Sequence, residues 1–140
     1  MDAFVEKEEV WAASVDETPG ALATTLSVLS DAGVDIDFLI MRRAPDKPGT
    51  GVLFVTPIQG DREVQAATEV GFAITRKLYS VRVEGANEPG IAAKLAKAIG
   101  DAGIKIRGMS AAVSGVRFVA HFGLDSADDQ KTVVELLANL

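Results

Sequence analysis

Polar and apolar positions alternate along two short stretches of the chain, and each stretch leads into a proline–glycine pair. Trp11, Ala13 and Val15 fall on one face of the first stretch, and Val81 and Val83 take the equivalent places in the second. A period of two residues is typical of a strand with one buried face. The sequence therefore predicts a strand before each Pro-Gly pair.

An amphipathic helix is predicted after each Pro-Gly pair, because apolar residues then recur every three or four positions. Proline is tolerated in the first turn of a helix, so we expect both helices to begin at the Pro-Gly itself. Gly33 and Gly103 are expected to end them. The predicted buried stripes are Leu22, Leu26, Leu29 and Gly33 in the first helix, and Ile91, Leu95, Ile99 and Ala102 in the second.

Two strands joined by a turn, and then a second helix, are predicted in each half. In the first half they cover residues 34–41, 52–57 and 61–70, with the turn at 44–51. In the second half they cover residues 104–109, 116–124 and 127–138, with the turn around 114–115. The first of these strands places Val34, Ile36, Phe38 and Ile40 on one face and Asp35, Asp37, Leu39 and Met41 on the other. The order strand, helix, strand, strand, helix is the start of a ferredoxin-like α+β domain.

The two halves are related by an offset of 70 residues. Pro19-Gly20 aligns with Pro89-Gly90, and residues 31–33 (Asp-Ala-Gly) align with residues 101–103, which have the same sequence. Matches at a single offset, in the same kinds of segment, indicate an internal duplication.

The fourth strand of each half leads to a prediction about domain organisation. Residues 72–75 can supply it in the first half, but no residues follow Leu140 to supply it in the second. Ala73-Ile74 aligns with Ala3-Phe4, so we expect the N-terminal strand to complete the second sheet. The sequence thus predicts a circularly permuted pair of βαββαβ domains, the first at 8–76 and the second at 77–140 plus 2–7.

Composition narrows the classes of function. Apolar residues make up 48% of the chain, and 20 acidic against 14 basic side chains give a formal charge of −6, which argues against a nucleic-acid partner. Cysteine is absent and His121 is the only histidine, which argues against disulfides, metal sites and a resident cofactor. With no apolar stretch of membrane-spanning length and no signal peptide, we expect a cytoplasmic protein without a membrane partner.

An enzymatic site is not expected. His121 lies on a predicted strand whose inner face is formed by neighbouring apolar residues, so it should point to the opposite face, at a surface or interface. No phosphate-binding glycine motif occurs, since Gly49 and Gly51 are explained by a hairpin turn. The predicted inner face consists of Val116, Phe118, Ala120, Phe122 and Leu124.

The loop at residues 16–22 has the features of a ligand site. A helix N-terminus leaves backbone N–H groups unpaired and favours a carboxylate, and Gly20 lets a ligand approach the backbone. Asp16 could receive an ammonium group, so together the two ends suit an α-amino acid. The residues leave a second interpretation open, in which Thr18 is only an N-cap, Pro19 sits at the first helical position and Asp16 is solvated.

The chain resembles a pair of ACT domains. The resemblance rests on a strand followed by Asp-x-x-Pro-Gly, an amphipathic helix, the Ala-Gly-Val-Asp-Ile-Asp stretch at 32–37 and a hairpin, and it spans nearly all 140 residues. The permuted order and the Gly-Thr-Gly-Val-Leu-Phe-Val-Thr stretch at 49–56 are most similar to the regulatory region of aspartate kinases without the kinase domain. Asp35 and Met41 stand where that region usually has asparagine and glutamine.

The resemblance implies a function and a set of contacts. ACT pairs bind amino acids at domain or subunit interfaces and signal their presence to an enzyme. The implied ligand contacts are Asp16, Thr18, Pro19, Gly20, Ala21, Leu22, Asp35, Ile36, Asp37 and Met41. A second site at residues 86–90 is less expected, because Ala86 replaces Asp16 there.

The sequence as a whole predicts a non-catalytic amino-acid-binding regulatory or sensor protein. We expect it to form a homodimer, with the first-half domains next to one another, and to act on a metabolic enzyme or as a free-standing regulatory subunit. Two alternatives remain open from the residues: a ligand-free structural or interaction module of the same fold, and a small ferredoxin-like enzyme.

Overall fold

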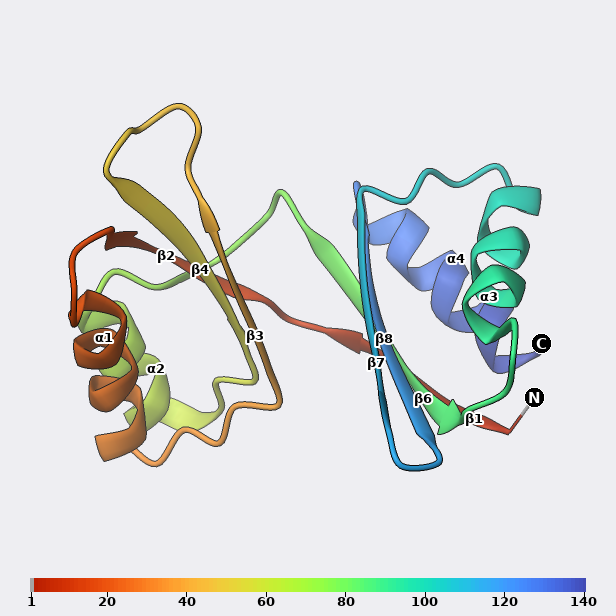
Figure 1. The fold of residues 1–140 in the computed structure, drawn as a ribbon, viewed down its shortest axis with the longest axis horizontal. Helices are drawn as coiled ribbons and strands as arrows, with labels where there is room; N and C mark the ends of the chain where they lie inside the picture. The colour runs from red at the N-terminus through yellow and green to blue at the C-terminus, as the bar shows by residue number, and fades with distance from the viewer. Residues whose placement is uncertain (1) are drawn as a thin grey trace. The chain divides into compact units, whose positions relative to one another are not determined.

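The computed structural model describes residues 2–140, which form two compact units. One unit is Glu9–Thr75, here named the first-half unit; the residues up to Glu8 together with Arg76–Leu140 form the second-half unit. Each unit has one four-stranded antiparallel sheet and two helices on one face of it (Figure 1). The predicted α+β class with two such sheets is confirmed.

The first-half unit follows the predicted element order. Its elements are β2 (Trp11–Asp16), α1 (Ala21–Asp31), β3 (Phe38–Arg43), β4 (Thr50–Thr56), α2 (Gly60–Glu69) and β5 (Ala73–Ile74). The strands lie in the order β3-β4-β2-β5. Alternation along β2 buries Trp11, Ala13 and Val15 under the helices, as the period of two predicts.

The strand predicted at 34–41 begins four residues later, at Phe38. Gly33 has a left-handed φ of +88°, and the N–H of Val34 turns back to the carbonyl of Leu29, 3.0 Å away. This six-to-one bond closes the C-terminus of α1, so Val34 belongs to the end of the helix rather than to a ladder. The chain joins the sheet edge only where the N–H of Asp37 donates to the carbonyl of Thr56.

The second-half unit repeats this arrangement with an N-terminal strand. Its elements are β1 (Ala3–Glu8), β6 (Tyr79–Ala86), α3 (Ile91–Asp101), β7 (Gly108–Ser114), β8 (Arg117–Leu124) and α4 (Ala127–Ala138). The strands lie in the order β1-β6-β8-β7. All six residues of β1 pair antiparallel with β6, so β1 holds the position that β5 holds in the other sheet. Val116, predicted on the inner face of a strand, lies in the turn before β8 and is 78% exposed.

Each unit has its own apolar core between sheet and helices. The buried residues of the first core are Trp11, Ala13, Val15, Leu29, Leu53, Val55, Ile58, Ala67 and Phe72. Those of the second are Val81, Val83, Ile91, Leu95, Ile99, Phe118, Ala120, Phe122, Leu124, Val133 and Leu137. From β1, Ala3 and Val5 pack against the second core, whereas Phe4 points away from it and is 70% exposed.

The faces of β1 allow a matched test of its part in the second-half unit. We expect Val5→Ser to lower the free energy of unfolding by about 1.5–3 kcal/mol, because it removes apolar contacts and buries a hydroxyl. Phe4→Ser, one residue away, should change it by less than about 0.5 kcal/mol. Urea titration monitored by circular dichroism measures both values. Equal effects would contradict a β1 strand that packs against the core through Val5 and not through Phe4.

A charged network lies on β6 and its neighbours in the second-half unit. Arg82 Nη2 is 2.9 Å from Glu84 Oε2, and Arg117 Nη2 is 3.3 Å from Glu84 Oε1. The opposite side of the Arg82 guanidinium faces Glu6, 3.9 Å away on β1. Hydrogen bonds from Arg82 and then Arg117 lower the pKa of the Glu84 carboxyl below its ordinary value.

This lowered pKa predicts a pH dependence of stability. A carboxyl with a depressed pKa in the folded state stabilises the fold fully above its unfolded pKa, about 4.3. That contribution is lost as the pH falls below this value and through the lower folded pKa of Glu84. Urea unfolding between pH 3 and 6 should therefore show a decline towards acid that is shallower in Glu84→Gln. An identical slope in both proteins would show that the network contributes nothing.

Candidate functional site

The two Pro-Gly pairs form turns of the same geometry, but neither helix begins at its proline. Helices α1 and α3 begin at Ala21 and Ile91, each one residue after its glycine. Gly20 and Gly90 have left-handed φ values of 87° and 85° and occupy the N-cap positions. The predicted start at the Pro-Gly is therefore wrong, because a positive φ cannot belong to a right-handed helix and glycine adopts it at no steric cost.

The N-terminus of α1 has no side-chain cap. The N–H of Ala21 donates to the carbonyl of Thr18 at 3.2 Å, and the N–H of Thr24 donates to Gly20 at 3.0 Å. Between them, the N–H groups of Leu22 and Ala23 have no acceptor within residues 2–140. The first turn also carries no acidic side chain. Two donors and the positive end of the helix are thus available to an anion.

Asp16 ends β2 at the start of the same loop. It lies opposite Thr50 in the ladder and its side chain is exposed. The neighbouring Glu17 is already paired, since its Oε2 is 3.1 Å from Nε of Arg43. Asp16 takes part in no ion pair among the residues that the structure describes. The loop therefore presents open donors at one end and an unpaired carboxylate at the other.

The other predicted contacts lie elsewhere in the first-half unit. Asp16 is level with Thr50, whereas Asp37 is level with Thr56 at the far end of β4. Six residues of strand span roughly 20 Å, so Asp35, Ile36 and Asp37 do not meet the loop within one unit. The sequence analysis placed these residues in one site, whereas the structure places them at opposite ends of the sheet.

Several predicted contacts have packing roles. Ala21, Leu22, Ile36 and Met41 pack against the first core. Met41 in particular lies over Gly51, where an added Cβ would come within 2.8 Å of the Met41 Cε. Thr18, Pro19 and Gly20 are exposed at the turn, as are Asp35 and Asp37 at the opposite end.

The second Pro-Gly loop has the same open helix start. The N–H of Ile91 donates to Glu88 at 3.2 Å and that of Lys94 to Gly90 at 3.0 Å, so Ala92 and Ala93 keep free N–H groups among the described residues. The difference is at the strand end, where Ala86 replaces Asp16. This loop therefore offers an anion site without a carboxylate in the place of Asp16.

His121 alternates with Phe118, Ala120 and Phe122 and so lies on the opposite face of the sheet, as predicted, but it is buried there rather than at a free surface. Its side chain is only 8% exposed, and its Nδ1 atom is 2.7 Å from Oε1 of Glu8 on β1. The hydroxyl of Ser80 donates to the same carboxylate oxygen at 3.0 Å, and Gln130 Nε2 donates to the carbonyl of Ser80 at 2.8 Å. The buried carboxylate is thus satisfied by partners from two other strands, which points to a structural role.

A matched pair of substitutions tests this role. Glu8→Ala should destabilise the protein by about 2–4 kcal/mol, because it leaves the buried polar atoms of His121 and Ser80 without their acceptor. The adjacent Glu9 is exposed, and Glu9→Ala should change stability by less than about 0.5 kcal/mol. Thermal and urea unfolding give both values, and comparable losses would count against a structural role for the pair.

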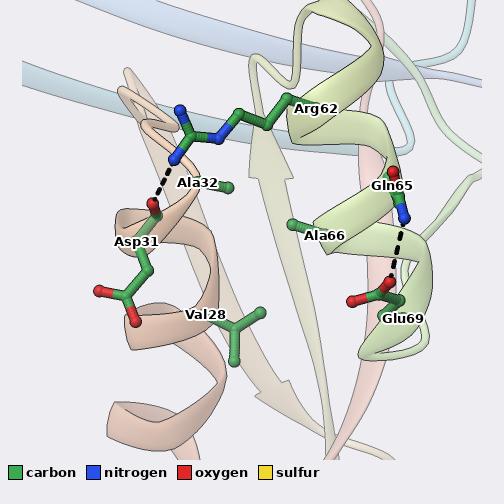
Figure 2. Close-up of a pocket in the computed structure, with 7 residues that line it drawn as sticks. All are labelled: Val28, Asp31, Ala32, Arg62, Gln65, Ala66 and Glu69. Carbon is green, nitrogen blue, oxygen red and sulfur yellow. Dashed lines mark hydrogen bonds between the residues drawn. The ribbon is translucent and has the colours of Figure 1, made fainter.

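A groove between α1 and α2 was missed by sequence reasoning. It has a volume of about 290 Å³ and lies on the solvent side of the two helices (Figure 2). The small side chains of Ala32 and Ala66 leave room between the helices. The sequence could indicate this groove only if α1 and α2 were already known to be neighbours. The lining residues are Val28, Asp31, Ala32, Arg62, Gln65, Ala66 and Glu69.

The described part of the chain has neither a clustered metal site nor a membrane-spanning helix. No group of three or more histidine, cysteine, aspartate or glutamate side chains in residues 2–140 is arranged to hold a metal ion. Within the same residues, every helix is too short or too polar to cross a membrane.

Comparison with known proteins agrees with this fold. Residues 79–140 match the ACT domain. No curated protein sequence matches the chain. Among solved structures, a protein from Bacteroides thetaiotaomicron has a TM-score of 0.75 at 20% identity, covering 99% of this chain and 90% of that one.

Two aspartate kinase structures are also similar. The ligand-free regulatory subunit of aspartate kinase from Thermus thermophilus has a TM-score of 0.66 at 16% identity, covering 98% of this chain and 95% of that one. Aspartokinase III of E. coli, in complex with aspartate and ADP, has a TM-score of 0.59 at 12% identity over 99% of this chain and 33% of that one. The resemblance to ACT domains and to aspartate kinase regulatory regions without the kinase domain is confirmed, and identities this low establish fold alone.

Proposed function

We propose that this chain, with an ACT domain at residues 79–140 and the fold of aspartate kinase regulatory regions, is a non-catalytic protein that binds an α-amino acid for regulation. The observation that carries the proposal is the open N-terminus of α1 beside the exposed carboxylate of Asp16.

The ligand carboxylate binds the N–H groups of Leu22 and Ala23. These donors point out of the first turn, the helix dipole is positive there, and no side chain competes for them. Gly20 keeps the approach open, because nothing lies within 4 Å of the position that its Cβ would occupy. The ligand ammonium binds Asp16, whose carboxylate lacks an ion-pair partner within residues 2–140.

A second copy of the chain completes the site in this proposal. Asp35 to Asp37 lie about a strand length from the loop within one unit, so they can reach the same ligand only from another copy. A homodimer with adjacent first-half units would bring the loop 16–22 of one copy towards residues 35–37 of its partner. Met41 and Ile36 then support the site by packing rather than by contact.

The organisation and setting of the protein belong to the same proposal. We take the chain to be a circularly permuted tandem pair of ACT domains, at 8–76 and at 77–140 plus 2–7, supported by the pairing of β1 with β6. It acts in the cytoplasm on a metabolic enzyme, as a partner or free-standing regulatory subunit, and itself needs no cofactor. The similarity to the regulatory subunit of an aspartate kinase supports this role.

The test is binding of individual amino acids to the full chain and to Asp16→Ala. A thermal-shift series over the proteinogenic amino acids identifies the ligand, and calorimetry then gives its affinity. Loss of a charge-assisted hydrogen bond costs about 1.5–3 kcal/mol, so Asp16→Ala should weaken binding roughly ten- to a hundredfold. The fold should be unchanged, because Asp16 is exposed and outside the core.

Asn87→Ala is the matched control in the second loop and should leave affinity nearly unchanged. Substitution of Gly20 is a poorer test, because its φ of +87° strains any other side chain and would distort the turn itself. Equal binding by Asp16→Ala and the parent chain would place the amino acid elsewhere. Absence of any stabilising amino acid would favour the ligand-free interaction module.

A further inference from the structure

Three charged residues line the groove between α1 and α2: Arg62 near one end, Glu69 near the other, and Asp31 on α1. Arg62 and Glu69 lie on the same helix, and Figure 2 shows Val28, Ala32 and Ala66 between them. Seven residues of α-helix rise about 10 Å, which sets the spacing of the two side chains along the groove. The strip between the charges is apolar and partly buried.

Arg62 and Glu69 are both oriented, yet neither is neutralised. Arg62 Nη2 donates to the main-chain carbonyl of Asp31 at 3.1 Å, which fixes the guanidinium across the end of α1 and leaves its other N–H groups available. Glu69 Oε1 accepts a hydrogen bond from the neutral amide of Gln65 at 3.4 Å. Neither residue forms an ion pair within residues 2–140.

The duplicated half shows that helix packing alone does not require these residues. At the offset of 70, Val64 and Ala67 correspond to Val134 and Leu137, and all four pack against their respective cores. The same offset places Thr132, Leu136 and Asn139 where the groove has Arg62, Ala66 and Glu69. The second-half unit thus keeps the helix pair but has neither charge, and a leucine replaces the small residue of the floor.

We propose that this groove binds an elongated zwitterion, with its carboxylate at Arg62, its ammonium at Glu69 and its methylene chain on Val28, Ala32 and Ala66. Because the two charges are about two helical turns apart, the ligand must carry its own charges at the ends of a chain rather than on one carbon. An ω-amino acid such as 6-aminohexanoate has this form. Its volume fits within the roughly 290 Å³ of the groove.

This site is separate from the Pro-Gly loop and does not depend on the proposed function. The loop precedes the first residue of α1, whereas Val28, Asp31 and Ala32 lie at the other end of that helix. Eleven helical residues rise about 16 Å, so one small ligand cannot occupy both places. The two sites also select different ligands, since the loop requires carboxylate and ammonium on one carbon.

The experiment measures binding of 6-aminohexanoate to the full chain by calorimetry and by amide chemical shifts. We expect a dissociation constant in the millimolar range, about 1–10 mM, as the groove is open, with shifts concentrated at residues 28–32 and 62–69. Hexanoate and hexylamine each lack one charge and should bind at least about tenfold more weakly. Circular dichroism of each variant checks that it is folded before its binding is measured.

Three variants replace groove residues with the residues found at the equivalent positions of the second-half unit. Arg62→Thr and Glu69→Asn should each weaken 6-aminohexanoate binding by about tenfold or more, and Ala66→Leu should abolish it by filling the floor. Lys131→Thr, which removes an exposed charge on α4, should leave it unchanged. Equal binding of hexanoate or hexylamine, wild-type affinity in Arg62→Thr or Glu69→Asn, or shifts confined to residues 16–22 would overturn the proposal. Loss of binding at the groove would leave the proposed α-amino-acid site at the loop untouched, since the loop is tested separately with α-amino acids and Asp16→Ala.

Discussion

The pairing of β1 with β6 is the constraint on which the second-half unit depends. This ladder joins residues 3–8 to residues 80–85, so it brings together segments that are more than 70 positions apart. It adds a fourth strand to the sheet of the second-half unit and places Ala3 and Val5 over the core. It also places Glu8 against His121, Ser80 and Gln130. A unit of about 70 residues buries a modest share of its surface, so an edge strand and a satisfied buried carboxylate are a large part of its stability.

The duplication preserves what the scaffold needs and varies what faces solvent. Both sheets have the same strand order, both first helices follow a glycine with positive φ, and both leave two N–H groups open in the first turn. Differences at exposed positions include Asp16 against Ala86 at the loop, and Arg62 and Glu69 against Thr132 and Asn139 on the second helix. Buried apolar contacts specify the fold in each half. They do not constrain the exposed side chains, so the chemistry of the loop and of the second helix can differ between the halves without a change of architecture.

The electrostatics of the two candidate sites share one principle. In the loop, the helix fixes the orientation of the open main-chain donors, and in the groove Arg62 is fixed by a bond to the last carbonyl of α1. Groups held in place before binding lose little entropy when a ligand arrives. Glu84 on the sheet, by contrast, is already paired with Arg82 and Arg117.

Much of the architecture follows from local sequence patterns. The period of two along residues 11–15 and 81–83, the helical stripes after each Pro-Gly pair and the 70-residue repeat determine the order of elements, because those patterns act between residues close in sequence. Local geometry shifts two boundaries: the positive φ of Gly20 moves the helix start, and the closing bond of Val34 delays β3 to Phe38. Other features depend on the tertiary structure. The burial of His121 requires Glu8, 113 positions away. The distance between Asp16 and Asp37 is set by the register of β4, and the groove exists only because α1 and α2 lie side by side. In these last three cases the deciding contact joins residues that no local pattern connects.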